Sequence, residues 1–188
     1  ITYTCFMNKF SYFKSIQYDI QRTMECDPAA KSKIEVYFLY PHMIALRAYR
    51  KAHWLWIHNH RFCARWLSQR ARRKTGIEIH PGAQIGRGLF IDHGMGVVIG
   101  ETAIIGDDCQ LYHGVTLGGV GSQEVKRHPT LEDGVYVGSG AKCLGNITLG
   151  QNCRVGANAV VLKDVPKYAT AVGVPARIIR KDKEGRRL

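Results

Sequence analysis

Apolar residues recur every six positions through the second part of the chain. The series begins at Ile79, Ile85 and Ile91, slips by two residues and resumes at Ile99. A helix repeats every 3.6 residues and a half-buried strand every two, so a period of six fits neither element alone. It is typical of a short strand followed by a turn, repeated many times. The series continues through Ile105, Leu111, Leu117, Leu131, Val137, Cys143, Leu149, Val155 and Val161.

Two further features support this repeated unit. Glycine often follows the repeating residue, as in Ile85-Gly86, and it permits turn dihedrals that other residues resist. Three such units form one triangular coil, and stacked coils bury a ladder of aliphatic side chains. We therefore expect a β-helix over residues 76–175 whose flat faces favour side-by-side association. A second small or apolar residue lies four positions on, at Ala83, Ala103, Cys109, Val115, Val135, Ala141, Cys153 and Ala159.

The first part of the chain follows a helical pattern. Residues 1–75 are predicted to form an α-helical domain, because apolar positions there recur at steps of three and four. Asp27-Pro28 is interpreted as a helix start, with Asp27 as N-cap, and Pro41 marks another break. The periodic residues are Leu46, Tyr49, Ala52, His53 and Trp56. Three tryptophans are expected to pack between the helices: Trp54, Trp56 and Trp66.

One interruption of the six-residue period predicts a loop. Leu117 and Leu131 are fourteen positions apart, where two regular repeats would need twelve. The surplus has to leave the coil over residues 118–130, which include Lys126-Arg127-His128-Pro129. Functional residues concentrate on loops that a rigid scaffold holds in place, so this loop is a candidate part of a site.

Composition is that of a globular protein, with 45% hydrophobic and 22% charged residues. No apolar run approaches the roughly 20 residues of a membrane helix, and the start lacks the layout of a secretion signal. The six cysteines form no CxxC pair and no zinc-finger spacing, so we interpret them as reduced thiols that serve as small core residues. We expect a cytoplasmic protein without a metal site.

The net charge of +12 has three interpretations. No helix-turn-helix or RNA-recognition pattern accompanies it, so nucleic-acid binding is not expected, nor is a membrane partner. A solvated helix surface explains the basic run at 70–74. Attraction of a polyanionic small molecule such as coenzyme A explains the basic C-terminal tail, residues 176–188.

Several short motifs follow one another in a family-specific order. They are Asp27-Pro28-Ala29, Ala48-Tyr49-Arg50, His53-Trp54-Leu55-Trp56, Ile79-His80-Pro81, Asp92-His93, Gly100-Glu101-Thr102, Gly118-Gly119, Arg127-His128-Pro129 and Gly173-Val174-Pro175-Ala176-Arg177. In this combination the chain resembles the serine acetyltransferases, over about residues 15 to 180. Hexad repeats alone are shared by many acyltransferases, whereas the helical segments joined to the later motifs are specific to this family.

The resemblance implies a fold, an assembly and a reaction. The fold would be α+β, an α-helical N-terminal domain followed by a left-handed parallel β-helix of hexapeptide repeats. The assembly would be a homotrimer with active sites between neighbouring coils. The reaction would move acetyl from acetyl-CoA to the L-serine hydroxyl, giving O-acetylserine for cysteine biosynthesis. L-cysteine would be a feedback inhibitor bound in the serine site.

The resemblance also assigns site residues. Asp92, His93, Arg127 and His128 fall on the family's serine-site positions. Asp27 falls on a helical-domain aspartate that helps to hold the amino acid. Glu78 falls where many members carry the aspartate paired with the catalytic histidine, and it is one methylene longer. For acetyl-CoA, the positions are Gly119, Ser139 and Ala157 along the tunnel, with Lys163, Arg177 and Arg180 as candidates for the phosphates.

These residue types suit the chemistry. A serine hydroxyl needs a base to become a nucleophile, and His93 oriented by Glu78 would supply one. The substrate ammonium would pair with Asp27 and Asp92, and its carboxylate with Arg127. Two other histidines, His80 and His113, are interpreted as structural.

The sequence departs from the family at both ends. The helical domain is shorter than in long-form members, which use the extra length to pair two trimers, so we expect a trimer. The chain ends at Arg186-Arg187-Leu188 without the isoleucine that lets many members dock into O-acetylserine sulfhydrylase, which puts that partner in doubt.

Three other functions compete with serine acetylation. A different hydroxyl acceptor, such as a sugar or an antibiotic, is the nearest, and the helical motifs argue against it. A zinc lyase on the same helix would need histidines five residues apart on a coil, but the pair with that spacing, His53 and His58, lies in the helical part. A non-enzymatic scaffold would not need Asp92-His93.

Overall fold

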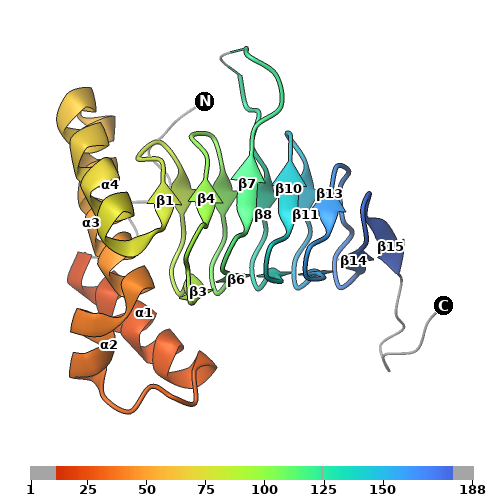
Figure 1. Cartoon of the computed structure of the whole chain (residues 1–188). Helices are drawn as coiled ribbons and strands as arrows, with labels where there is room; N and C mark the ends of the chain where they lie inside the picture. The colour runs from red at the N-terminus through yellow and green to blue at the C-terminus, as the bar shows by residue number, and fades with distance from the viewer. Residues whose placement is uncertain (1–11, 124, 180–188) are drawn as a thin grey trace.

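The computed structural model describes residues 12–123 and 125–179. Within these ranges, helices occupy the N-terminal part and short strands the rest, and Figure 1 shows the helices gathered at one end of an elongated stack of coils. The helices are α1 (Tyr12–Cys26), α2 (Lys33–Leu39), α3 (Pro41–Ile57) and α4 (Arg61–Thr75). None of the helices in the described part of the chain is long and apolar enough to cross a membrane.

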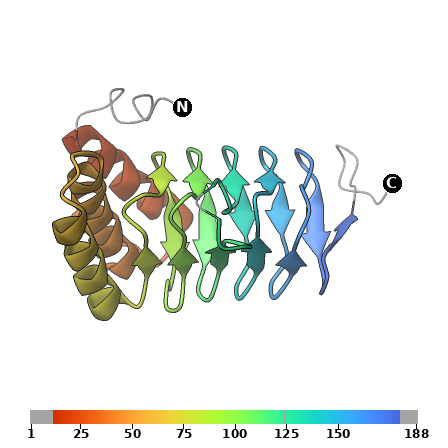
Figure 2. The ribbon, with the colours of Figure 1, turned by 90° about the horizontal axis from the view of Figure 1, so that it is seen from above.

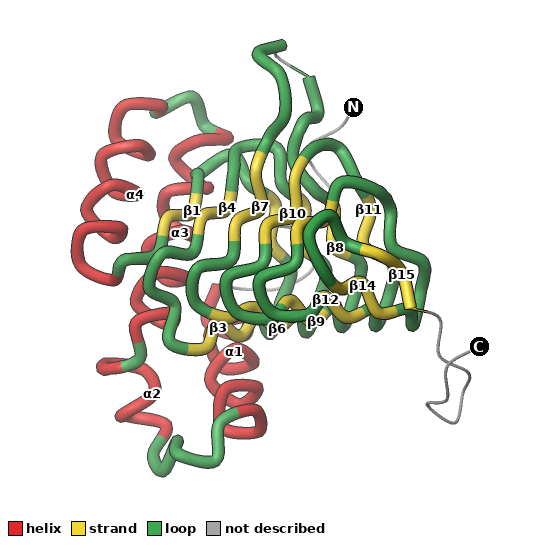
Figure 3. Tube along the Cα trace, turned by 45° about the vertical axis from the view of Figure 1, so that its right-hand side comes forward, coloured by secondary structure: helices red, strands yellow, loops and turns green. Residues whose placement is uncertain are grey.

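The strands form three sheets, which are the faces of a triangular prism. The first four coils each contribute one strand to each sheet, so a strand pairs in parallel with the one a coil further on. Figures 2 and 3 show the coils as successive rungs along the stack. This confirms the expected left-handed β-helix.

Each sheet is named here by its strands. Sheet A contains β1 (Glu78–Ile79), β4 (Val98–Ile99), β7 (Thr116–Gly118), β10 (Lys142–Leu144) and β13 (Val160–Val161). Sheet B contains β2 (Gln84–Ile85), β5 (Ile104–Ile105), β8 (Thr130–Leu131) and β11 (Thr148–Leu149). Sheet C contains β3 (Phe90–Asp92), β6 (Gln110–Tyr112), β9 (Tyr136–Val137), β12 (Arg154–Val155), β14 (Thr170–Val172) and β15 (Arg177–Ile179), of which β15 is antiparallel to β14.

The six-residue series lines the interior of the prism, as predicted. Every residue of the series is at most 7% exposed, and in sheet A Ile79, Ile99 and Leu117 stack directly on one another. The residues four positions on are all fully buried. Each buried aliphatic side chain contributes about 1.5–3 kcal/mol relative to an exposed one, so this ladder is the main source of stability.

The helical domain departs from one prediction and confirms another. α1 ends at Cys26, so Asp27-Pro28 does not start a helix. The Asp27 carboxylate instead accepts a hydrogen bond from the Ala29 amide at 2.8 Å, within a turn. Pro41 does mark a break, since it is the first residue of α3.

The tryptophans and two of the cysteines are less buried than predicted. Trp54 is 48% and Trp66 57% exposed, because α3 and α4 pack through one face and leave the opposite face in solvent. Trp56 is half-buried beneath the Arg61 guanidinium, 3.9 Å from the ring centroid. Three cysteines are core residues as expected, namely Cys109, Cys143 and Cys153, whereas Cys26 is half-buried, Cys63 is exposed and Cys5 lies outside the described residues.

Buried polar contacts fix the helical domain against the first coil. The Tyr49 hydroxyl donates to the Ala83 carbonyl at 2.7 Å. Asp19, whose side chain is almost fully buried, accepts from the Gly88 amide at 2.8 Å and pairs with Arg50 at 2.7 Å. Two carboxylate oxygens thus join α1 to both α3 and the β-helix, which sets where the α1–α2 connection lies.

Candidate active site

His93 lies on the edge of the prism where the chain passes from sheet C to sheet A, here called the C–A edge. It directly follows β3 and has a left-handed backbone (φ 59°), as does Gly94 after it. This turn leaves the imidazole side chain 74% exposed, with Nε2 at 3.8 Å from Asp92 Oδ1. The edge therefore carries an accessible imidazole beside a carboxylate.

Later coils place three more residues on the C–A edge. Strand register aligns Asp92 with Tyr112, Leu111 with Val137, and Val137 with Val155. Continued past the ends of the strands, this register places three residues in one column with His93. They are His113, Ser139 and Ala157.

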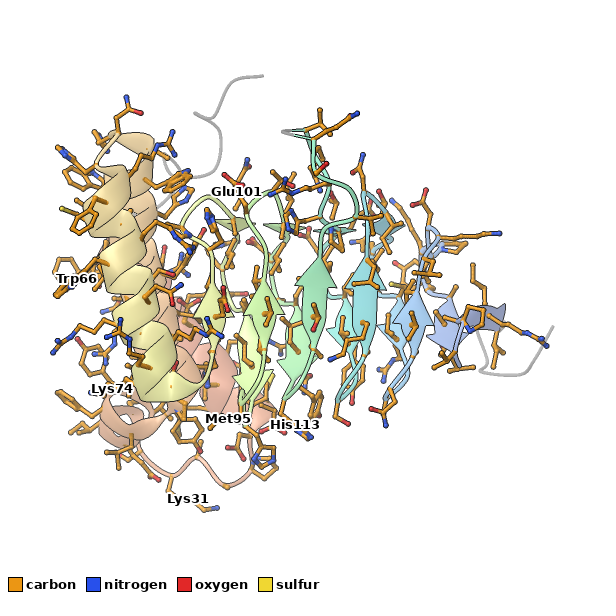
Figure 4. All side chains as sticks on the ribbon, turned by 45° about the horizontal axis from the view of Figure 1, so that its top comes forward. Lys31, Trp66, Lys74, Met95, Glu101 and His113 are labelled. Carbon is orange, nitrogen blue, oxygen red and sulfur yellow. The ribbon has the colours of Figure 1, made fainter. Side chains whose placement is uncertain are left out.

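The sequence predicts a structural role for His113 and does not by itself indicate that it lies beside His93. Its ring centroid lies 5.9 Å from that of His93, in an edge-on arrangement. Figure 4 shows His113 next to Met95 on this edge. The signal was available, because His113 follows β6 as His93 follows β3, but it needed the register of the two coils.

Asp27 approaches the C–A edge from the helical domain. Figure 4 shows Lys31, on the same α1–α2 connection, near the edge that carries Met95 and His113. Hydrogen bonds from the Tyr40 hydroxyl and then the Ala29 amide hold the pKa of Asp27 below its usual range, and the charges of His42 and His93 lower it further. Asp27 is therefore ionised at neutral pH and within electrostatic reach of His93.

Arg127 and His128 lie on a different edge, where the chain passes from sheet A to sheet B. The loop between β7 and β8 rises clear of the stack on this A–B edge (Figure 1). Both backbone amides donate to Thr102 Oγ1, at 3.1 and 3.2 Å. The Arg127 guanidinium lies 3.5 Å from Glu101, which Figure 4 shows on the opposite side of the prism from Met95 and His113.

The hydrogen bonds of His128 define its state. The Thr102 amide donates to Nδ1 at 3.2 Å, so the neutral ring carries its proton on Nε2. Burial first, and then the Arg127 and Lys126 charges, lower the pKa of His128. The ring also packs against Gly100, where an added Cβ would lie 2.0 Å from His128 Cδ2. This contact and the bonds to Thr102 join the Gly100-Glu101-Thr102 and Arg127-His128 motifs in space.

The predicted pair of Glu78 with His93 is not formed within the single chain. The Glu78 carboxylate lies 3.2 Å from Arg72 Nη1, and no hydrogen bond or ion pair joins it to His93 among the described residues. Glu78 lies in β1 of sheet A and pairs with Val98 of β4. His93 lies on the C–A edge, before β4 begins. The carboxylate beside His93 in this chain is that of Asp92.

The predicted acetyl-CoA residues divide between the same two edges. Ser139 and Ala157 lie on the C–A edge, below His93 and His113 in the column. Gly119 begins the loop of the A–B edge, and Lys163 follows β13 on that edge. Arg177 is exposed in β15, and Arg180 lies outside the described residues.

The two histidines with zinc-lyase spacing are engaged elsewhere. His53 Nδ1 donates to the Pro81 carbonyl and His58 Nδ1 to the Trp54 carbonyl, both at 2.7 Å. In the described part of the chain, no three His, Cys, Asp or Glu side chains are grouped so that they could hold a metal ion.

Comparisons with known proteins point to one family. No family model matches the chain. The serine acetyltransferase of Helicobacter pylori strain J99 is 60% identical over 168 residues, which is 89% of this chain and 98% of that protein. A crystal structure of Neisseria gonorrhoeae serine acetyltransferase in complex with serine superposes with a TM-score of 0.86 at 38% identity, over 89% of this chain and 69% of that one. A serine acetyltransferase in complex with cysteine gives 0.88 at 42% identity, over 91% and 66%.

Proposed function

This chain belongs to the serine acetyltransferase family, and on that premise we propose that it transfers the acetyl group of acetyl-CoA to the L-serine hydroxyl, with His93 as general base. The observation that carries the proposal is that Asp92 lies beside His93 on the C–A edge, and that Asp27 approaches this edge closely enough for its charge to interact with that of His93. Two carboxylates beside an accessible imidazole suit a substrate with an ammonium group and a hydroxyl to be deprotonated. The products are O-acetylserine and CoA.

The proposed reaction needs one proton carrier. His93 takes the proton of the serine hydroxyl as its oxygen attacks the thioester carbonyl carbon. The tetrahedral intermediate then collapses, the carbon–sulfur bond breaks, and the imidazolium returns the proton to the CoA sulfur. Histidine suits both steps because imidazole exchanges protons near neutral pH.

The zwitterionic backbone of serine sets the remaining contacts. Its ammonium pairs with Asp27 and Asp92, and its carboxylate with Arg127, through charge-assisted hydrogen bonds. His128 can donate from Nε2, because Nδ1 is occupied by the Thr102 amide. Since Arg127 and His128 lie on the other edge of the prism, this set of contacts requires a second chain.

A trimer supplies that second chain. The C–A edge and the A–B edge both border sheet A. If three chains turn sheet A towards a threefold axis, the C–A edge of each meets the A–B edge of its neighbour, and the ring closes. Each junction then collects Asp27, Asp92 and His93 from one chain, and Arg127 and His128 from the next. The proposed acetyl-CoA residues of the two edges face each other along the same junction.

Two carboxylates compete to orient His93. Asp92 is at 3.8 Å in the single chain, whereas Glu78 holds the family position but is paired with Arg72. Glu78 can serve only if its side chain leaves Arg72 when the site is assembled. We keep Glu78 as the proposed partner of the far ring nitrogen and Asp92 as a partner of the substrate ammonium.

Cysteine fits the same site as serine. It has the same ammonium and carboxylate and a side chain of the same length, and a serine acetyltransferase has been crystallised with cysteine. Its sulfur would lie where the serine oxygen lies, next to His93 and His128. We propose that cysteine inhibits competitively with serine.

A direct assay tests the proposed function. The protein is mixed with acetyl-CoA and serine, and thiol release is compared with that for homoserine, threonine and a panel of sugars. Release that saturates with serine and is weak with the other acceptors is expected. Release with a sugar hydroxyl and none with serine would overturn the proposal.

A further inference from the structure

Tyr40 holds the Asp27 carboxylate. Its hydroxyl donates to Asp27 Oδ2 at 2.7 Å, while the Ala29 amide donates to Oδ1 at 2.8 Å. Each carboxylate oxygen therefore has one donor, and the two together fix the plane of the group. Tyr40 has extended backbone between α2 and α3, and Pro41 after it favours that conformation. The backbone conformation at Tyr40 therefore fixes the point from which its side chain reaches Asp27.

Buried contacts tie this pair to the strand that precedes His93. The ring of His42 lies edge-on to both Tyr40 and Phe90 of β3, with centroids 5.7 and 5.2 Å apart. His42 Nε2 is 2.9 Å from Thr23 Oγ1, and the Thr23 carbonyl accepts from the Asp27 amide at 2.9 Å. Thr23 and His42 are almost fully buried. A closed series of contacts therefore joins Asp27, Tyr40, His42 and Thr23. The His42 ring connects this series to β3 through Phe90.

We propose that Tyr40 is a positioning residue for the amino-acid substrate, whose hydroxyl holds the Asp27 carboxylate in the orientation that receives the substrate ammonium beside His93. The inference rests on the proposed role of Asp27. It adds a residue that none of the family motifs in the sequence contains.

The electrostatics agree with this geometry. The Tyr40 hydrogen bond is the largest influence that lowers the pKa of Asp27. Burial, and then the bond to Asp27, raise the pKa of Tyr40 to about 12, so its hydroxyl remains a donor at working pH. The other groups that act on Asp27 are His42 of α3 and His93 of the C–A edge, and both favour its ionised form.

Tyr40→Phe removes the hydroxyl and keeps the ring contact with His42. The serine KM is expected to rise roughly tenfold, the scale of one hydrogen bond to a charged group. The cysteine Ki should rise in parallel, with kcat and the acetyl-CoA KM within about twofold of wild type.

Tyr37→Phe is the matched control. Tyr37 lies in α2 under the Arg47 guanidinium, at 3.9 Å, and its loss of a hydroxyl should leave all these values unchanged. In an Asp27→Asn background, Tyr40→Phe should add little further loss, since the two residues act through one contact.

The outcomes separate this inference from the proposed function. If Asp27→Asn raises the serine KM and a folded Tyr40→Phe does not, Tyr40 is not a positioning residue, while the serine site stands. If Tyr40→Phe lowers kcat and both affinities alike together with Tm, its role is structural and the inference is wrong. If Asp27→Asn itself leaves serine binding intact, the proposed role of Asp27 fails and the inference fails with it.

Discussion

His93 is held in a left-handed backbone conformation that most residues with a side chain avoid. A test of its role has to keep that backbone, and asparagine tolerates it better than alanine. We expect His93→Asn to lower kcat by about 10²–10⁴, the usual range for loss of a general base, with the acetyl-CoA KM largely kept. The measurement is steady-state thiol release. Near-normal kcat in a folded variant would rule out His93 as the base.

Arg127 is expected to bind serine and cysteine alike, because both present the same carboxylate. Arg127→Ala should weaken both ligands together, by roughly the 2–5 kcal/mol of losing one partner of a buried charge pair. The serine KM and the cysteine Ki are measured on the same variant. Intact cysteine inhibition alongside collapsed serine binding would mean that the two ligands use different sites.

At the scale of single residues, the sequence predicted most of the candidate site residues but not the groups that they contact. Asp92, His93, Arg127 and His128 stand in recognisable motifs. By contrast, Tyr40 carries no motif, and its partner Asp27 is thirteen residues away across a turn and a helix. Such a contact depends on how α2 and α3 pack, which no local pattern encodes.

The β-helix is the element that the sequence predicts best, because a six-residue period dictates which side chains face inward in every coil. The helical part was harder. Asp27-Pro28 has the composition of a helix start, yet the same residues also suit a turn, and α1 ends just before them. Trp54 and Trp66 follow helical spacing, but spacing alone does not say which face of a two-sided helix layer stays in solvent.

The contact between the helical domain and β3 should make stability depend on pH. Burial lowers the pKa of His42 to about 4 from an ordinary 6.5, so below pH 6.5 the unfolded chain binds a proton that the folded chain refuses. The contribution of neutral His42 to the free energy of unfolding is therefore fully present above pH 6.5. It decreases by up to about 3 kcal/mol as pH falls towards 4.

Denaturant unfolding between pH 7 and pH 4 measures this loss, with His42→Gln as the comparison. Glutamine does not titrate in this range and can still bond Thr23, so the variant should lose less stability on acidification than wild type. Equal slopes for the two proteins would mean that His42 is not held neutral in the fold.

The whole molecule divides its site residues between two edges of one prism, and this division could not be predicted from the sequence. The edge on which a residue falls depends on the coil register, which the slip after Ile91 and the loop after Gly118 both shift. Once the register is known, Asp92 and His93 belong to one edge, which Asp27 approaches from the helical domain, and Arg127 and His128 belong to the other. This separation leads to the central claim that each active site is built from two chains.

Mixed trimers test that claim most directly. His93→Asn and Arg127→Ala chains, each with little activity alone at low serine, are co-expressed with different tags and the doubly tagged trimers are purified. Because each junction takes His93 from one chain and Arg127 from the next, every trimer that contains both chains should have one intact junction in three, with activity restored towards about a third of wild type. Mixed trimers that contain both chains, yet are no more active than either parent, would contradict a site shared between chains.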